Sequence, residues 1–274
     1  MIWTTDAVVV RVVRYGERDA ILTLLTETGL VTALARGGAR PTGRLSAASR
    51  LCAQGTYVLY QGRGMGDVRQ AEIARQRRAL HEDVVKAAYA AYLCDLASRA
   101  LPERPDAPPA AYRQFVAVLD GLEADRVPAD VLARAFELKV CAWLGVAPEW
   151  RACMRCGAPL GETEGAPWYD PQEGGLVCSP CALRSGLADD TTRRAAGWPV
   201  PRKASAILHL LARADIAKLQ RVDLSGSTRD AMSRILAHQL REFAGVGGRA
   251  RQVLEEIVAS LADPPANDQG DLDT

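Results

Sequence analysis

Histidine and aromatic residues are scarce in this sequence. The 274 residues include three histidines, and Phe, Trp and Tyr together make up 5%. His81, His209 and His238 each stand alone in a stretch with helical periodicity, and none shares a known catalytic spacing with a nucleophile or an acid. A G-x-S-x-G elbow, an H-E-x-x-H motif and a phosphate-binding Walker loop are also missing. These absences argue against an enzyme and against a small-molecule substrate.

Long hydrophobic runs are missing as well. No stretch approaches the roughly 20 apolar residues that a membrane-spanning helix needs. The first residues, MIWTTDAVVVRVVRYGE, have an apolar run that Arg11 interrupts, without the basic region and the small-residue cleavage site of a signal peptide. The 48% hydrophobic and 24% charged content is ordinary for a soluble globular protein with room for two or three compact units. We therefore expect a cytoplasmic protein with no membrane partner.

Lysine is absent from the first 80 residues. This region carries twelve arginines against six acidic residues, a net charge of +6. The rest of the chain carries 22 basic and 27 acidic residues, a net charge of −5. A basic unit on an otherwise acidic chain indicates a polyanionic partner for that unit. Charge alone leaves a second interpretation open, in which the arginines form a solvated face without a partner.

Four of the seven cysteines form two C-x-x-C pairs separated by 21 residues. They are Cys153, Cys156, Cys178 and Cys181. This spacing is a strong zinc signature, because each pair supplies two thiolates from a tight turn and the intervening segment only needs to fold back as a hairpin. Four thiolates leave no open coordination position, so we predict a zinc ribbon that holds one structural Zn²⁺.

Other uses of these cysteines fit the sequence less well. Two disulfides require an oxidising compartment, for which the sequence shows no export signal. A redox-active C-x-x-C pair usually follows a strand and opens a helix, and the flanking residues do not indicate that setting. Cys52, Cys94 and Cys141 lie in apolar surroundings, and we predict that they are core residues.

Residues 5–76 have the pattern of a β-protein. The expected strands cover residues 8–13, 20–26, 30–35, 57–60 and 68–73, with a short helix within 45–53. Five short strands with a helix after the third predict an OB-fold, a small barrel that often binds single-stranded nucleic acid. The glycine-rich residues 62–67 lie between two strands and open no helix, so they predict a hairpin turn and not a dinucleotide-binding loop.

A basic, glycine-containing loop stands out within this barrel. Residues 36–44 read RGGARPTGR, and no Gly-Lys-Ser/Thr follows to make them a P-loop. Glycine allows a close backbone approach, and arginine presents fork-shaped donors to phosphates. Because Tyr57 and Tyr60 have the spacing of core residues, few aromatic residues remain for base stacking. We therefore expect binding led by phosphates, weakly sequence-specific and strongly salt-dependent.

The remaining chain is predicted to be helical around the zinc element. Helices are expected from about residue 81, over 112–122, and over 131–144 with Asp130 as N-cap, and the last of these is apolar almost all round. After a linker at 198–201, further helices are expected at 203–213, 215–221, 227–244 (capped by Ser227 and Asp230) and 249–261. The predicted units are an OB-fold at 1–80, helical parts at 81–150 and 186–262, the zinc element at 151–185 and a disordered acidic tail at 263–274.

At three places the sequence resembles the RecO family of bacterial recombination mediators. Residues 15–26 (YGERDAILTLLT) look like the second-strand signature of that family. Residues 136–157, which run from FELK through LGVAP to CMRCG, look like its helix leading into the zinc site. RGGAR at 36–40 resembles its basic Lys/Arg-Gly-Ala-Arg segment, with an extra glycine and with Arg in place of Lys. The similarity covers residues 5–258.

The resemblance implies a DNA-binding, non-enzymatic protein of DNA repair. Such proteins bind single- and double-stranded DNA, anneal complementary strands and contact the C-terminal tail of the single-strand-binding protein SSB. They work with RecR, and indirectly with RecF, to load RecA at the nucleoid. Some members of the family lack the cysteines, so the resemblance does not make zinc necessary for the function.

The resemblance and the charges suggest site residues. Arg36 and Arg40 are the DNA contacts that the family segment implies first. Charge alone adds Arg11, Arg14, Arg18, Arg44 and Arg63. The SSB tail is acidic and ends in an apolar residue, so its pocket is expected to join a cation to an apolar groove on the helical unit. Candidates for that cation are Lys139, Arg202 and Lys203.

Three other classes of function stay open at this stage. A zinc-ribbon and OB-fold module that binds RNA would prefer structured RNA over single-stranded DNA. A protein scaffold would bind partners without salt dependence and would have no affinity for DNA. A hydrolase with an unrecognised site would turn over nucleic-acid ends.

Overall fold

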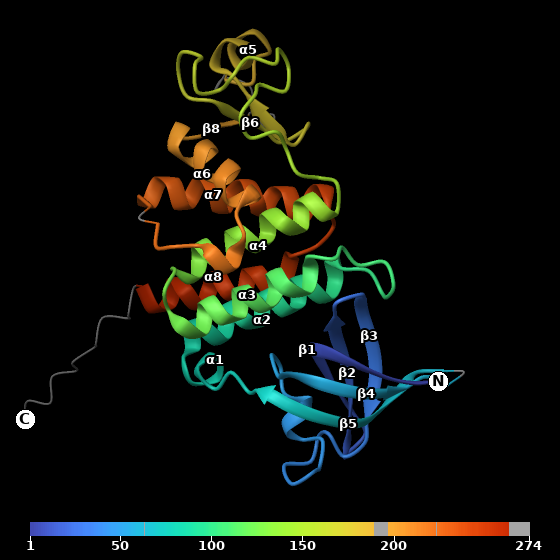
Figure 1. The fold of residues 1–274 in the computed structure, drawn as a ribbon. Helices are drawn as coiled ribbons and strands as arrows, with labels where there is room; N and C mark the ends of the chain where they lie inside the picture. The colour runs from blue at the N-terminus through green and yellow to red at the C-terminus, as the bar shows by residue number, and fades with distance from the viewer. Residues whose placement is uncertain (63, 189–196, 223, 263–274) are drawn as a thin grey trace, which may run out of the picture.

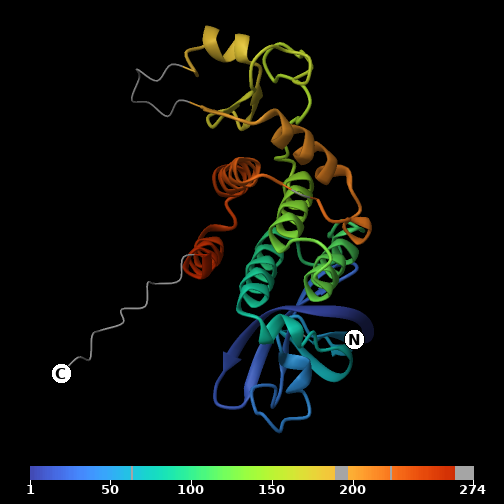
Figure 2. The same cartoon turned by 90° about the vertical axis from the view of Figure 1, so that its left-hand side faces the viewer.

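The protein is built from three parts arranged along one long axis. The structure, a computed structural model, describes residues 1–62, 64–188, 197–222 and 224–262. A β-barrel lies at one end, a layer of helices in the middle and a small cysteine-containing element at the other end (Figures 1 and 2). The predicted disordered tail at 263–274 lies outside the described residues.

The N-terminal part is a closed barrel of five strands. Its strands are β1 (Ile2–Tyr15), β2 (Asp19–Thr26), β3 (Gly29–Ala35), β4 (Gln54–Tyr60) and β5 (Gly66–Arg75). Their order around the barrel is β1-β2-β3-β5-β4, with β3 and β5 parallel and every other pair antiparallel. This topology confirms the predicted OB-like barrel. The antiparallel pairing of β4 with β5 confirms the hairpin interpretation of the segment that joins them.

The alternation of side chains along the strands builds the barrel core. Leu22 and Leu24 of β2 point inward with Val9 of β1 and are fully buried. Tyr57 is also fully buried, and its hydroxyl donates to the Ala48 carbonyl at 3.0 Å. The helix expected within 45–53 is shorter than predicted, a single 3₁₀ turn at Ala47–Ser49.

Helices make up most of the remaining chain. They are α1 (Ala79–Glu82), α2 (Val84–Ala100), α3 (Ala111–Ala124), α4 (Ala129–Trp143), α5 (Ser179–Arg184), α6 (Arg202–Arg213), α7 (Gly226–His238) and α8 (Gly248–Ala262). The helix α4 is central, as its apolar sequence predicts, and α2, α3, α6 and α7 all pack against it. The helix α8 packs on α2, so the segments before and after the cysteine element share one core.

Helix ends differ from the sequence-based expectation at several places. Pro128 and not Asp130 is the N-cap of α4, and Ser225 and not Ser227 precedes the first residue of α7. Only a 3₁₀ turn, Ile216–Lys218, forms within the predicted helix 215–221, and the Asp215 carboxylate caps it by accepting the backbone N–H of Ala217. A π-helical turn, Gln239–Phe243, ends the predicted helix 227–244.

The barrel and the helices meet through both apolar and polar contacts. Leu25 and Leu30 on the outer face of the barrel are buried in the helical core. Arg77 is buried, and its guanidinium donates to the Asp120 carboxylate at 2.5 Å and to the Gln54 side-chain oxygen at 2.6 Å. The three cysteines predicted as core residues are buried, and the sulfurs of Cys52 and Cys94 lie 3.5 Å apart at this junction.

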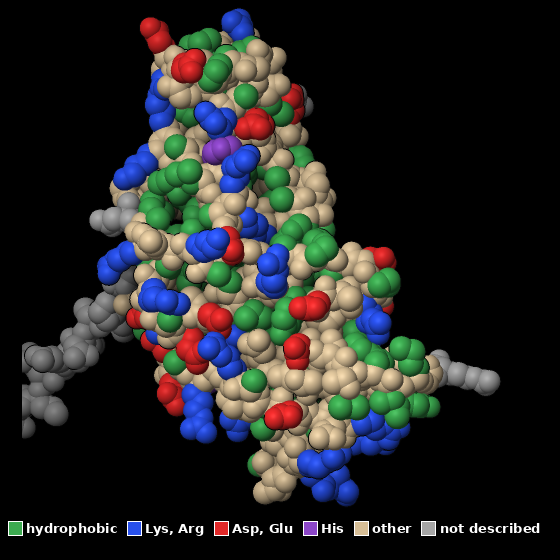
Figure 3. Space-filling view, in the orientation of Figure 1, with side chains coloured by type: hydrophobic (Ala, Val, Ile, Leu, Met, Phe, Trp, Pro, Cys, Tyr) green, Lys and Arg blue, Asp and Glu red, His purple; other side chains and the backbone are tan. Residues whose placement is uncertain are grey.

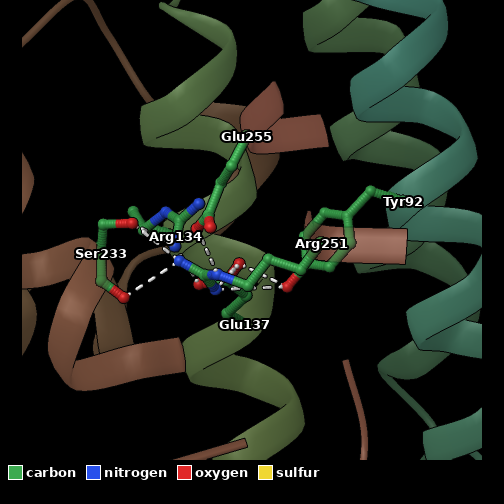
Figure 4. A network of polar contacts seen from close by, with 6 residues as sticks. All are labelled: Tyr92, Arg134, Glu137, Ser233, Arg251 and Glu255. Carbon is green, nitrogen blue, oxygen red and sulfur yellow. Dashed lines mark hydrogen bonds and ion pairs between the residues drawn. The ribbon is translucent and has the colours of Figure 1, made fainter. Parts of the chain in front are cut away.

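A buried ionic network joins four helices at the centre of the helical layer (Figure 4). Glu137 on α4 is fully buried and lies 3.0 Å from Arg251 of α8 and 2.9 Å from Arg134. Tyr92 on α2 donates its hydroxyl to Glu137 at 2.6 Å, and Arg251 also donates to Ser233 of α7. Burial lowers the pKa of Arg251, but the nearby Glu137 carboxylate and Tyr92 outweigh it and raise the pKa, so the guanidinium stays charged.

Among the helices of the described residues, none combines the length and the hydrophobicity that crossing a membrane requires.

Candidate nucleic-acid interface and metal centre

The four predicted zinc ligands converge on one point. The sulfurs of Cys153, Cys156, Cys178 and Cys181 all lie within 4.8 Å of one another. A tetrahedral ion with Zn–S bonds of about 2.3 Å requires sulfurs about 3.8 Å apart. The sulfurs of Cys156 and Cys178, one from each pair, lie 3.7 Å apart. The cluster therefore fits a four-thiolate zinc site.

The local backbone explains how the first cysteine pair forms a knuckle. Gly157 has a φ of +73°, and its N–H donates to the Cys153 carbonyl at 2.8 Å, which closes the turn. Burial raises the pKa of the Cys153 thiol, but backbone N–H groups of residues 178, 156 and 155 outweigh burial and lower that pKa to about 6. Amide donors aimed at a sulfur favour the thiolate, the form that binds a metal.

The segment between the two knuckles is a short sheet. The strands β6 (Trp168–Asp170) and β7 (Gly175–Val177) form the predicted hairpin. The predicted linker at 198–201 is partly wrong, because Trp198–Pro199 pairs with β6 as a third strand, β8. The second knuckle follows β7 and opens α5, a setting that redox-active pairs also use. Convergence of all four sulfurs distinguishes this element from a lone redox pair.

The basic loop at residues 36–44 packs against the turn between β1 and β2. The Gly37 N–H donates to the Asp19 carboxylate at 2.7 Å, and the Ala39 N–H donates to the Arg18 carbonyl at 3.0 Å. Gly37 has a φ of +71°, which a glycine adopts without strain. These contacts bring Arg18 of the turn beside Arg40 of the loop, and both are exposed.

The same loop reaches the neighbouring strand β5. Arg36 lies 3.5 Å from the Asp67 carboxylate, and Arg44 donates to the Arg69 carbonyl at 2.9 Å. Arg69 also lies near Asp67 and stacks over the ring of Tyr60, 4.8 Å from its centroid. The sequence analysis included Arg69 only in the net charge of the barrel and did not propose it as a site residue. Its place in the alternating pattern of β5 could have indicated an exposed side chain. The spacing of Tyr60 predicted a core residue, but its side chain is half-buried and contacts Arg69 at the surface.

The candidate DNA contacts are exposed arginines on the strands, the turn and the loop of the barrel. Arg11 lies mid-strand on β1, and the others lie near the end of the barrel where the loop begins. Those in the described residues, together with Arg69, are hereafter the arginine surface: Arg11, Arg14, Arg18, Arg36, Arg40, Arg44 and Arg69. In Figure 3, Lys and Arg side chains lie at the lower edge of the barrel, and others are spread over the helical layer and the cysteine element. The register places Arg14 beside Ala20 and Ala20 beside Ala35, so Arg14 lies two strands from the start of the loop. Arg63 lies outside the described residues.

The three candidate cations for the SSB tail do not share one groove. Lys139 is half-buried and donates to the Ala212 carbonyl at 2.7 Å, and burial lowers the pKa of its amine. Arg202 donates to the carbonyls of Leu160, Gly161 and Thr163 beside the cysteine element. Lys203 is exposed on the first turn of α6.

Comparison with protein families matches both halves of the chain. Residues 1–77 match the model described as Recombination protein O N terminal, and residues 81–247 match Recombination protein O C terminal. The boundary between the two matches falls where β5 has ended and the first helices begin.

Curated relatives named DNA repair protein RecO match along most of their length. The chain is 35% identical over 250 residues to the protein of Symbiobacterium thermophilum, covering 86% of this chain and 90% of the relative. It is 32% identical over 268 residues to that of Heliobacterium modesticaldum, covering 96% and 93%. It is 26% identical over 260 residues to that of Bacillus subtilis, covering 94% and 95%. The chain therefore belongs to the RecO family of DNA repair and recombination proteins.

Proposed function

We propose that this protein binds single- and double-stranded DNA, anneals complementary strands and, with RecR, helps to load RecA onto SSB-coated DNA. The observation that supports this most is the arginine surface, where a folded loop adds its charges to those of two strands. Arginines at this density neutralise phosphates on two strands at once and lower the repulsion that opposes pairing. Annealing requires no bond chemistry, so no catalytic group is needed. The work would take place on DNA in the cytoplasm.

The direct test is annealing of complementary oligonucleotides coated with the cognate SSB, with this protein added last at two salt concentrations. We expect acceleration that fades as the salt concentration rises, because the phosphate contacts displace bound counterions. Absence of acceleration by folded protein would contradict the proposal and direct the search to RNA and protein partners.

Removal of two loop arginines is expected to weaken DNA binding without regard to sequence. The double variant Arg36→Ala/Arg40→Ala should bind single-stranded DNA at least about tenfold more weakly at low salt. The slope of log affinity against log salt should become shallower by about 1.4, since each single-strand phosphate contact contributes about 0.7. Fluorescence anisotropy over a salt series measures both quantities.

A matched control is available on α2. Arg99 is exposed and forms an ion pair with Asp95 on the same helix, so Arg99→Ala removes one surface arginine away from the barrel. Affinity and salt slope of this control should equal those of the wild type. If the affinity and salt slope of the double variant also equalled those of the wild type, Arg36 and Arg40 would not be part of the DNA-binding site.

The helical layer contains a groove that is complementary to an acidic peptide ending in an apolar residue. It lies between α3 and residues 216–221 and has a volume of about 660 Å³. Its apolar lining includes Val116, Ala117, Val127, Leu132, Ile216 and Leu219. Exposed cations around it are Arg113, Arg126, Lys218 and Arg221. We propose this groove as the site of the SSB tail. A smaller groove of about 470 Å³ beside Arg202 is the alternative that the sequence suggested.

The two grooves can be separated with a fluorescent SSB-tail peptide. Arg126→Ala/Arg221→Ala should weaken peptide binding on the order of tenfold, and more at low salt, because the lost charges attract the acidic peptide. Arg202→Ala/Lys203→Ala should leave the affinity unchanged. The opposite pattern, measured by anisotropy, would move the tail to the groove beside α6.

We further propose that the four cysteines hold one structural Zn²⁺. The convergence of the sulfurs and the amide donors around Cys153 support this assignment. A closed set of thiolates would keep the cysteine element folded and leave the metal no catalytic role.

A further inference from the structure

The helix of the cysteine element places an arginine beside the sulfur cluster. The helix α5 begins directly after Cys178 and carries Cys181 on its first turn, with Arg184 three residues later. Residues three apart share one face of a helix, and a helical side chain leans back toward the N-terminus of its helix. The Arg184 side chain therefore reaches Cys181, and its guanidinium donates to the Cys181 sulfur at 2.9 Å.

The sulfurs of the cluster receive hydrogen bonds from different kinds of donor. Backbone N–H groups of residues 155, 156 and 178 donate to the Cys153 sulfur, and the Cys181 N–H donates to the sulfur of Cys178. The Cys181 sulfur accepts from the guanidinium of Arg184, which carries a full positive charge. A charge-assisted hydrogen bond is roughly twice as strong as a neutral one, so this contact weighs more than one amide bond.

Other arginines of the cysteine element have oxygen acceptors. Arg155, between the first two cysteines, lies 2.8 Å from the Asp170 carboxylate and 3.5 Å from that of Glu173. Arg202 donates to backbone carbonyls. Of the arginines that the structure describes, Arg184 is the one whose guanidinium contacts a cysteine sulfur.

Exposure also separates the four cysteines. Cys156 is exposed, whereas Cys153, Cys178 and Cys181 are at most 4% exposed. A chelator or an electrophile in water therefore meets the Cys156 sulfur before the other three.

We propose that Arg184 is a positioning residue of the metal centre, which holds the Cys181 thiolate in place and lowers its reactivity, so that loss of the ion begins at Cys156. This inference rests on the proposed Zn²⁺ site. Four thiolates around one Zn²⁺ leave a net negative charge, and a guanidinium beside one of them offsets part of it. A thiolate that accepts a charged hydrogen bond is a weaker nucleophile, because the donor stabilises its electron pair.

The first experiment measures transfer of zinc from the full-length, zinc-loaded protein to a chromogenic pyridylazo chelator. Arg184→Ala should release zinc about tenfold faster than the wild type, since loss of an outer-shell partner costs roughly 10- to 100-fold in metal affinity. Arg184→Lys keeps a charged donor and should recover part of this difference. Arg151→Ala, at an exposed arginine of the same element, is the control for lost charge and should release zinc like the wild type.

Cobalt in place of zinc gives a readout that a merely structural role would not change. A hydrogen bond lowers the energy of the thiolate electrons, so its loss in Arg184→Ala should move the sulfur-to-cobalt charge-transfer band to longer wavelength. The band of Arg151→Ala should keep its position. Brief alkylation with iodoacetamide, followed by mass spectrometry, should label Cys156 first among the four cysteines of the wild type, and Cys181 should be labelled earlier in Arg184→Ala.

Three results would overturn the inference. Zinc release and a cobalt band in Arg184→Ala equal to those of the wild type would show that the contact with Cys181 does not act on the metal centre. Faster release with an unshifted band would mean that Arg184 only supports α5. First labelling of another cysteine of the cluster would contradict a loss that begins at Cys156. Failure of the metal proposal has a different signature, because the wild type would then retain neither zinc nor cobalt after dialysis.

Discussion

Replacement of Glu137 by Gln is expected to lower the free energy of unfolding by about 3–5 kcal/mol. Glu137 is the carboxylate that faces the buried Arg134 and Arg251, whose side chains are 8% and 6% exposed. Without it, the buried Arg134 loses its carboxylate partner and Arg251 keeps only the exposed Glu255 to offset the loss of water. Urea denaturation followed by circular dichroism measures the change.

An exposed carboxylate that contacts the same arginine provides the control for this prediction. Glu255 also contacts Arg251, but its side chain is 57% exposed, so Glu255→Gln should change stability by less than about 1 kcal/mol. A combined replacement of Arg134, Glu137 and Arg251 by apolar residues should recover much of the loss, because no buried charge is then left unpaired. A Glu137→Gln variant as stable as the wild type would show that water reaches this network.

Loss of the proposed Zn²⁺ is expected to unfold the cysteine element while the barrel stays intact. Zinc binding to small four-ligand domains is worth on the order of 10 kcal/mol, and that energy is folding energy. Cys153→Ser should bind no zinc and should expose residues 151–188 to rapid proteolysis. Metal content per chain and limited proteolysis with mass spectrometry measure the two effects.

Cys153→Ser also tests whether DNA binding by the barrel is independent of the cysteine element. The barrel lies at the opposite end from the cysteine element (Figure 1), so Cys153→Ser should retain the DNA affinity of the wild type. Cys141→Ala, at a buried cysteine outside the cluster, should still bind one zinc per chain. If zinc-free wild-type protein resisted the protease as well as the zinc-loaded protein, the fold of the cysteine element would not depend on the metal.

Local patterns were enough for much of the barrel and for the metal ligands. Two C-x-x-C pairs at this spacing predict two knuckle turns, so the convergence of the four cysteines could be predicted before the fold was known. The alternation of inward and outward residues likewise predicted five strands. It underestimated β1, which runs from Ile2 to Tyr15, because the residues missed at its start are mostly exposed or half-buried and include the polar run Thr4, Thr5 and Asp6, which lacks the alternation of a strand.

The buried ion pair on α4 could have been predicted from the sequence. The helix α4 is apolar on every side, so Arg134 and Glu137 within it have no polar face to occupy and must be buried. That pattern predicts a buried ion pair. It does not identify Arg251 as the second partner, because Arg251 lies 114 residues after Glu137 in the sequence.

The sequence by itself determined the clustering of the four cysteines, the barrel class, the charge of the barrel and the family, because each depends on residue types at short spacings. Tertiary structure decided which arginines meet, since the hydrogen bond from Gly37 to Asp19 folds the loop onto a turn 18 residues away. It also decided where the groove beside α3 lies and how Glu137 is neutralised. These features form between segments far apart in the chain, and their geometry is set by packing that no local pattern encodes.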